Sequence, residues 1–236
     1  MLRIIDEKIF PALALAALVL FLVALWMIFF QAPVELTMGI VQKIFYVHVP
    51  AAMATYAGFI IAAIASMAFL FRPRQHWDIA ARTGAELGLI FCAFVLFSGS
   101  LWGYKAWGTW WVWDPQLTAT LILFLLYGGY VLLRLFGGNR RAVQRTAAVL
   151  AVVAVVNIPI IHYSVRLWGG IHPVVEREGG DGLAPEIAQV FGVSMLATVL
   201  VFAALLWLGF RVRLDEARLD ELHLEVEDLL LLREEA

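Results

Sequence analysis

Six long apolar stretches constrain this chain more than any other feature. They cover residues 11–30, 44–71, 86–101, 117–136, 146–165 and 187–210. A helix that crosses the ~30 Å hydrocarbon core of a bilayer needs roughly 20 mostly apolar residues, which these stretches approach or exceed. The chain is 63% hydrophobic and 15% charged, whereas soluble domains are about 25% charged. We therefore predict an all-α polytopic membrane protein with six transmembrane helices.

The basic residues predict how these spans are oriented. Most of the 17 lysines and arginines fall near the N-terminus, in short connectors at residues 72–82 and 137–145, and after residue 210. Because cytoplasmic segments are enriched in Lys and Arg, both termini are expected in the cytoplasm. The first stretch is too long for a signal-peptide core and should remain as an anchor. Three segments then face outward, at residues 31–43, 102–116 and 166–186.

Two parts of different composition are expected, a membrane domain at residues 1–210 and a tail at residues 211–236. The tail is acidic, with leucines at three- and four-residue spacing that predict a cytoplasmic amphipathic C-terminal helix. It is either a solvated extension or a docking helix for a cytoplasmic subunit or a second copy of the chain. The net charge of −2 gives no indication of nucleic-acid binding.

A tryptophan-rich segment occupies the second outward connection. Five of the nine tryptophans lie between residues 102 and 113, whereas an interfacial belt would be spread over all the helix ends. Indole faces stack on planar apolar ligands, and Gly103 and Gly108 allow close approach of the backbone. Asp114 followed by Pro115 is typical of a helix N-cap. This outward-facing Trp-rich loop is therefore interpreted as a binding surface, with Asp114 as a cap first and a site residue second.

Three histidines lie on the same predicted side as this surface. His48 is near the outer start of the second span, His162 is near the outer end of the fifth, and His172 is in the third outward segment. Each alone is readily explained as a polar residue at a helix end, and His162 is expected to pack within its span. Together, two of them can supply axial nitrogens to a haem iron, and His48 with His172 is the better pair. Lys43 and Arg166 either pair with carboxylates such as haem propionates or extend to the membrane interface.

A single cysteine, Cys92, limits how a ligand can be held. It excludes an intramolecular disulfide, a Cys-pair metal site and a Cys-x-x-Cys-His haem attachment. A zinc site normally needs three or four close ligands and no wide aromatic surface. Haem would therefore be bound reversibly, through iron–histidine bonds and stacking.

These residues resemble the cytochrome c maturation protein C family of haem-handling membrane proteins. The run Trp107-Gly-Thr-Trp-Trp-Val-Trp-Asp114 is similar to the tryptophan-rich WD segment of that family. Residues 42–52, and the path from residue 157 to His172, resemble its two outward histidine regions. The resemblance extends over residues 35–210. One departure is Gln116, which stands where the family often has arginine.

The resemblance implies a binding and delivery protein with no catalytic activity of its own. Such proteins hold haem b at the outer face of the bacterial inner membrane and deliver it to a periplasmic haem chaperone for cytochrome c maturation. They associate with ATP-binding-cassette transporter subunits and a small membrane subunit. The implied haem-binding residues are the axial metal ligands His48 and His172, the basic residue Lys43, and the WD residues Trp107, Gly108, Trp110, Trp111, Trp113 and Asp114.

Three other functions remain as alternatives at this point. A haem-b electron-transfer subunit would place paired histidines inside the bilayer, and a cytochrome c haem lyase component would have more spans and more histidines. A transporter permease would need polar or discontinuous helices at the midplane. Only Glu86, at the inner end of the third span, hints at that arrangement.

Overall fold

The computed structural model describes residues 8–34, 36, 38–138, 140–172 and 183–234, and within these ranges the chain is almost entirely helical. Six spans are long and apolar enough to cross a membrane, which confirms the predicted all-α, six-span architecture. The elements in chain order are α2 (Phe10–Trp26), η2 (Met27–Gln31), η3 (Ile40–Ile44), α3 (Phe45–Phe71), α4 (Gln75–Trp107), α5 (Pro115–Gly137), α6 (Arg141–Val155), α7 (Asn157–Trp168) and α8 (Pro185–Glu234).

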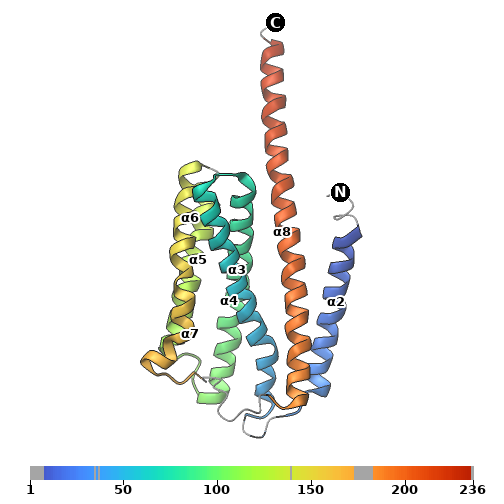
Figure 1. Ribbon diagram of the computed structural model, residues 1–236, viewed down its shortest axis with the longest axis vertical. Coiled ribbons are helices and arrows are strands. Elements are labelled where there is room, and N and C mark those ends of the chain that lie inside the picture. Colours follow the sequence, from blue (N-terminus) through green and yellow to red (C-terminus); the bar gives the residue numbers. More distant parts are fainter. Residues whose placement is uncertain (1–7, 35, 37, 139, 173–182, 235–236) are drawn as a thin grey trace.

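The helices pack in two groups (Figure 1). Helix α2 packs on α8, α8 packs against α3 and α4, and α5, α6 and α7 lie on the other side of α3 and α4. Both chain termini point to one end of the bundle, which we call the terminal end. The connections α2–α3, α4–α5 and α7–α8 lie at the opposite end, which we call the aromatic end. Each span carries the chain to the other side, so the connections after the first, third and fifth spans all lie at the aromatic end.

Small residues and one tyrosine hold the middle of the bundle together. A Cβ on Gly58 of α3 would lie 2.7 Å from the Gly88 Cα of α4, so the backbones of these helices approach as closely as small residues allow. Tyr127 of α5 stacks on Phe59 with ring centroids 3.8 Å apart. Its hydroxyl lies 3.1 Å from the carbonyl oxygens of Phe59 and Ala151, so one side chain connects α3, α5 and α6.

The fifth span is interrupted near its middle, a feature that the sequence reading did not anticipate. Helix α6 ends at Val155 and α7 begins at Asn157. Pro159 has no N–H to donate to the Val155 carbonyl four residues earlier, so the helical ladder cannot continue through this point. The Asn157 Nδ2 donates to the Ala119 carbonyl oxygen at 2.7 Å, which fastens the interruption to α5. The span nevertheless remains packed along its whole length on α5.

The terminal end contains ion pairs where short basic connectors were expected. Helix α4 begins at Gln75, well inside the connector predicted at residues 72–82. Asp78 of α4 is thereby buried and accepts from Arg134 Nη2 of α5 at 2.6 Å. Glu86 pairs with Arg82 of its own helix and with Arg213 of α8. The predicted connector is therefore mostly helix, and Asp78 within it pairs with a neighbouring helix.

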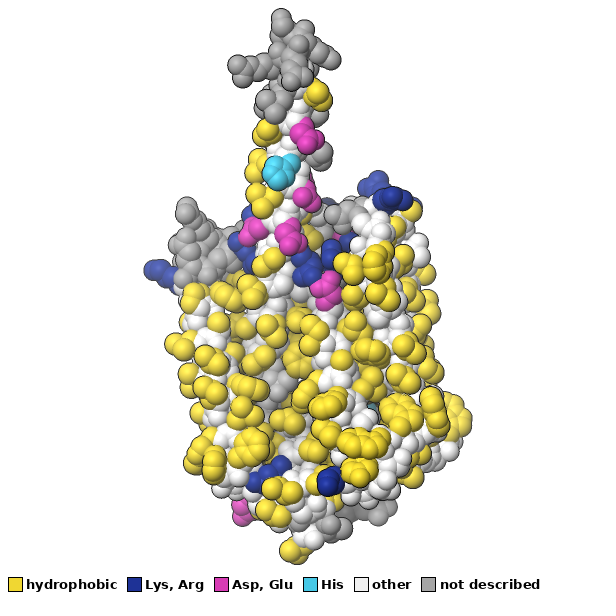
Figure 2. Space-filling view, turned by 180° about the vertical axis from the view of Figure 1, so that it is seen from behind, with side chains coloured by type: hydrophobic (Ala, Val, Ile, Leu, Met, Phe, Trp, Pro, Cys, Tyr) yellow, Lys and Arg dark blue, Asp and Glu magenta, His cyan; other side chains and the backbone are white. Residues whose placement is uncertain are grey.

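The outer surface matches a membrane setting. Hydrophobic side chains form a broad band whose two ends carry the charged residues (Figure 2). Helix α8 continues beyond the terminal end without interruption at residue 210, and acidic side chains appear on that extension. The sixth span and the C-terminal extension are thus one continuous helix, and the division of the chain into two domains stays a prediction.

Candidate functional site

The predicted site residues lie on three chain segments at the aromatic end. Helix α4 continues to Trp107 instead of ending at residue 101, so Trp102 and Trp107 are helical. Gly108 ends the helix in the left-handed conformation, with φ +76°, where residues other than glycine are strained. Residues 108–114, which we call the aromatic loop, then lead into α5. The sequence placed the helix end too early because a helix can extend beyond the hydrocarbon core into the interface.

The aromatic loop presents large exposed rings. The exposed fractions of Trp110 and Trp113 are 55% and 75%, and that of Trp107, the last residue of α4 before the loop, is 38%. Trp110 stacks on Tyr104 with centroids 4.3 Å apart and planes 13° apart. Trp111 meets Trp113 edge-on at 5.8 Å, and its Nε1 is buried without a hydrogen-bond partner among the described residues. Rings that contact mainly one another, with a donor left over, form a surface suited to a flat apolar ligand.

Asp114 joins the aromatic loop to the segment that carries His172. Its Oδ1 caps α5 by accepting from the backbone N–H groups of Gln116 at 2.9 Å and Leu117 at 3.1 Å. Its Oδ2 accepts from the backbone N–H groups of Ile171 at 3.0 Å and His172 at 3.4 Å. The predicted cap is confirmed, and the same buried carboxylate also tethers a segment 58 residues away.

A glycine makes this tether possible. A Cβ on Gly170 would collide with the Asp114 Oδ2, so the backbone can approach the carboxylate only without a side chain at this position. Gly170 follows Gly169, which ends α7 with φ +73°. The Gly-Gly pair therefore turns the chain out of α7 and brings residues 171 and 172 onto Asp114.

His48 lies in the first turn of α3, facing α4. Its side chain is 9% exposed, and its Nδ1 lies 2.9 Å from the Ser98 Oγ. Trp102 contacts the imidazole edge-on, with centroids 5.8 Å apart. A Cβ on Gly99 would lie 3.1 Å from the His48 Cε1, so this glycine leaves the ring its space. The imidazole is therefore held in one orientation by α4.

His172 is half-buried beside Asp114, and it lies close enough to His48 for an electrostatic interaction between the two rings. Burial lowers the pKa of His172 below its ordinary value, and the nearby Asp114 carboxylate opposes that shift in part. Its Nδ1 is buried without a hydrogen-bond partner in the described part of the chain. A neutral imidazole with an unused buried nitrogen is the form that binds a metal. The structure thus brings the two predicted ligands into one neighbourhood.

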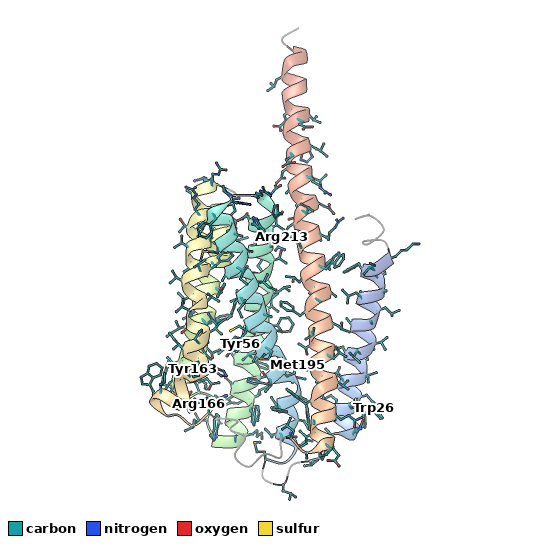
Figure 3. The ribbon with its side chains drawn as sticks, in the orientation of Figure 1. Trp26, Tyr56, Tyr163, Arg166, Met195 and Arg213 are labelled. Carbon is teal, nitrogen blue, oxygen red and sulfur yellow. The ribbon has the colours of Figure 1, made fainter. Side chains whose placement is uncertain are left out.

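The structure also defines the surroundings of Lys43 and His162. Lys43 Nζ donates to the Phe29 carbonyl oxygen at 2.9 Å, at the end of the first span. His162 was expected to pack within the fifth span, and this is wrong: its side chain is exposed on α7, edge-on to Tyr163 at 5.0 Å. Ile161 and Ser164 occupy the buried face of that helix instead. Tyr163 and Arg166 lie at the aromatic end, whereas Arg213 lies at the terminal end (Figure 3).

The donor set fits a haem better than a bare metal ion. Among the described residues, no group of three or more His, Cys, Asp or Glu side chains could hold a metal ion. Two histidines and an aromatic surface at one end of the bundle are the kinds of group that could supply axial nitrogens and stacking area to a porphyrin. The unpartnered nitrogens of His172 and Trp111 lie at this site.

Sequence reasoning missed three residues that position these groups. They are Ser98, Gly99 and Gly170, which contact His48 or Asp114 from distant parts of the chain. Ser98 gave a weak signal, since it is polar within an apolar stretch. Its partner is 50 residues away in sequence, and only the packing of α3 on α4 identifies it.

Comparison with known proteins adds an independent finding. The family described as "Heme exporter protein C" matches residues 1–225. The chain is 39% identical to heme exporter protein C of Escherichia coli (strain K12) over 162 residues, which are 69% of this chain and 66% of the relative, slightly under two thirds of its length. It is 35% identical to the Bradyrhizobium diazoefficiens protein of the same name over 203 residues, 85% of this chain and 77% of the relative. The Rhodobacter capsulatus protein of that name is 33% identical over 197 residues, covering 82% and 81%.

Proposed function

The chain belongs to the heme exporter protein C family, and on that premise we propose that it binds haem b non-covalently and delivers it for cytochrome c maturation. Haem is the cargo of this protein, held between His48 and His172 in front of the aromatic loop. The recipient is a periplasmic haem chaperone. No catalytic turnover is needed, because iron–histidine bonds and ring stacking are reversible.

One observation supports this proposal most: His48 and His172, 124 positions apart, both lie at the end of the bundle that carries the aromatic loop, and they are close enough to interact electrostatically. Asp114 connects all three parts, since it starts α5, ends the aromatic loop and holds the backbone of His172. His48 and His172 would supply the axial ligands. The exposed rings of Trp110 and Trp113 would cover a porphyrin face.

The orientation follows from the distribution of charge. The terminal end carries most of the arginines, which favours the cytoplasm, so the aromatic end would face the periplasm. The site would then open toward the chaperone at the outer face of the inner membrane. ATP-binding-cassette subunits and a small membrane subunit are the proposed partners, and the cytoplasmic extension of α8 offers a place for docking.

Substitution of the two ligands tests the proposal. In purified protein, His48→Ala or His172→Ala should abolish or shift the Soret band of bound haem, because each removes one axial nitrogen. His162→Ala is the matched control, since this exposed histidine lies near the same end and should leave the spectrum unchanged. A wild-type Soret band in either ligand variant would remove that histidine from the site.

Replacing exposed rings tests the aromatic surface separately. Trp113→Ala should weaken haem binding about 2- to 10-fold, since a ring contact contributes about 0.5–1.5 kcal/mol beyond area burial. Trp26→Ala removes another exposed ring, at 58% against 75% for Trp113, from the first span and should have no such effect. Equal effects of both variants would argue for a general interfacial belt instead of a binding surface.

A further inference from the structure

We propose that Ser98 is a positioning residue that holds His48 in the Nδ1–H tautomer and so leaves Nε2 free to bind the haem iron. The inference rests on the proposed function, in which His48 is an axial ligand. It assigns a role to a side chain of α4 that touches no ligand itself. Its evidence is the pattern of hydrogen bonds around the Ser98 hydroxyl.

The Ser98 hydroxyl has a single proton, and a backbone carbonyl takes it. Ser98 Oγ lies 2.7 Å from the Phe94 carbonyl oxygen and 3.3 Å from the Val95 carbonyl oxygen. A carbonyl oxygen can only accept, so the 2.7 Å contact requires the hydroxyl to donate its proton there. This is the usual bond of a helical serine to the carbonyl four residues earlier. The hydroxyl has no second proton to give.

His48 contacts the same hydroxyl oxygen from α3. Its Nδ1 lies 2.9 Å from the same oxygen, within hydrogen-bonding distance. Because Ser98 has already donated its proton, its oxygen can only accept from His48, and Nδ1 must therefore carry a hydrogen. In a neutral imidazole the other nitrogen, Nε2, then has the free lone pair. Free imidazole side chains favour the opposite tautomer, so this contact reverses the ordinary preference.

The contact between His48 and Ser98 is shielded from water. Both side chains are buried, so water cannot readily replace Ser98 as the acceptor. The hydrogen bond of the ring to α4 is made through Nδ1, and Trp102 meets the ring edge-on. Histidines that bind metals generally donate their second N–H to a nearby acceptor, which fixes the tautomer and the ring orientation. Ser98 provides that acceptor here.

Histidine tautomers can be read directly in the haem-free protein. We would record ¹⁵N imidazole spectra of ¹⁵N-histidine-labelled full-length protein in detergent at neutral pH, with His48→Gln to identify the His48 signals. The expected result is a protonated Nδ1 and an unprotonated Nε2. In Ser98→Ala the balance should shift toward the Nε2–H form, and Ser98→Thr, which keeps the hydroxyl, should retain the wild-type pattern. A wild-type His48 with its hydrogen on Nε2, or an unchanged tautomer in Ser98→Ala, would overturn the proposal.

Haem titration gives a second readout. Ser98→Ala should bind haem about 10- to 100-fold more weakly, the usual cost of losing such a supporting contact, and should shift the midpoint potential of the bound haem. Ser66→Ala is the matched control, because Ser66 is also a buried serine of the bundle. It lies on α3, 18 residues after His48 and therefore about 27 Å from it along the helix. Equal losses in both variants would indicate a general packing effect and refute the positioning role.

The two readouts separate this proposal from the proposed function. If His48→Ala keeps the wild-type haem spectrum, the ligand assignment fails, whatever tautomer the apo spectra show. If His48→Ala loses haem but the apo spectra place the hydrogen on Nε2, only the role of Ser98 fails.

Discussion

Asp114 has two separable functions, and replacing it by serine should remove only one of them. Serine is as good an N-cap as aspartate, so Asp114→Ser keeps the acceptor for Gln116 and Leu117 of α5. It lacks the second oxygen, which in the wild type accepts from the Ile171 and His172 N–H groups. Asp114→Ala removes both functions. Comparing the two variants therefore isolates the tether from the cap.

The magnitude follows from the geometry of the tether. The bond from the Ile171 N–H, at 3.0 Å, has good length, whereas that from His172, at 3.4 Å, is long and contributes little. A hydrogen bond to a charged group is worth about 1.5–3 kcal/mol. If haem binding requires His172 on its tether, Asp114→Ser should weaken it about 10- to 150-fold. Asp114→Ala should lose a similar factor in affinity, plus about 1 kcal/mol of stability from the cap.

Two measurements on detergent-solubilised protein check this prediction. Haem affinity is taken from Soret titration, and the free energy of unfolding from titration with a denaturing detergent. Asp215→Ser, at an exposed position of α8, is the control and should change neither quantity. Wild-type affinity in Asp114→Ser would refute the reasoning, because the carboxylate could then not be what places His172. Equal stability of the serine and alanine variants would refute the role of the cap.

Three other predictions follow from the same contacts. Gly170→Ala should weaken haem binding as strongly as Asp114→Ser, because its Cβ would push the backbone away from the carboxylate; Soret titration measures this. In the haem-free protein, an NMR titration should place the pKa of His172 below 6.5, since burial disfavours the charged ring and outweighs the opposing effect of the Asp114 carboxylate. Asp78→Ala should destabilise the bundle by about 3–5 kcal/mol, because it leaves Arg134 charged and buried without its partner.

Each of these has an outcome that would contradict it. Gly129→Ala, where a Cβ has open space, is the control for Gly170→Ala, and equal behaviour of the two would exclude the close approach to Asp114. A His172 pKa above 6.5 would mean that the Asp114 charge outweighs burial. For the ion pair, the double variant Asp78→Leu/Arg134→Met should recover most of the lost stability, and failure to do so would show that the contact is more than a charge balance.

The sequence by itself determined that this is a membrane protein, that it has six spans, and that the Trp-rich segment before Asp114 is the candidate binding surface. These properties depend on local composition. Each span must make its backbone hydrogen bonds within its own helix in lipid, so it is visible in the sequence as a long apolar run. The crowding of tryptophans before Asp114, and the cap formed by that residue, were equally local. The ends of the helices were predicted less accurately. The apolar stretch of the third span ends at residue 101, whereas α4 continues to Trp107.

Only the tertiary structure decided how the site is built. The rotation and packing of helices far apart in the chain bring His48 to Ser98 and Asp114 to Ile171. The same packing leaves His162 exposed and His172 half-buried. A helix can turn any face toward its neighbours without changing the length of its apolar stretch. Hydropathy therefore does not predict which face packs against the other helices. Spacing along the chain identified which residue types were available, and the contacts between helices selected which of them meet.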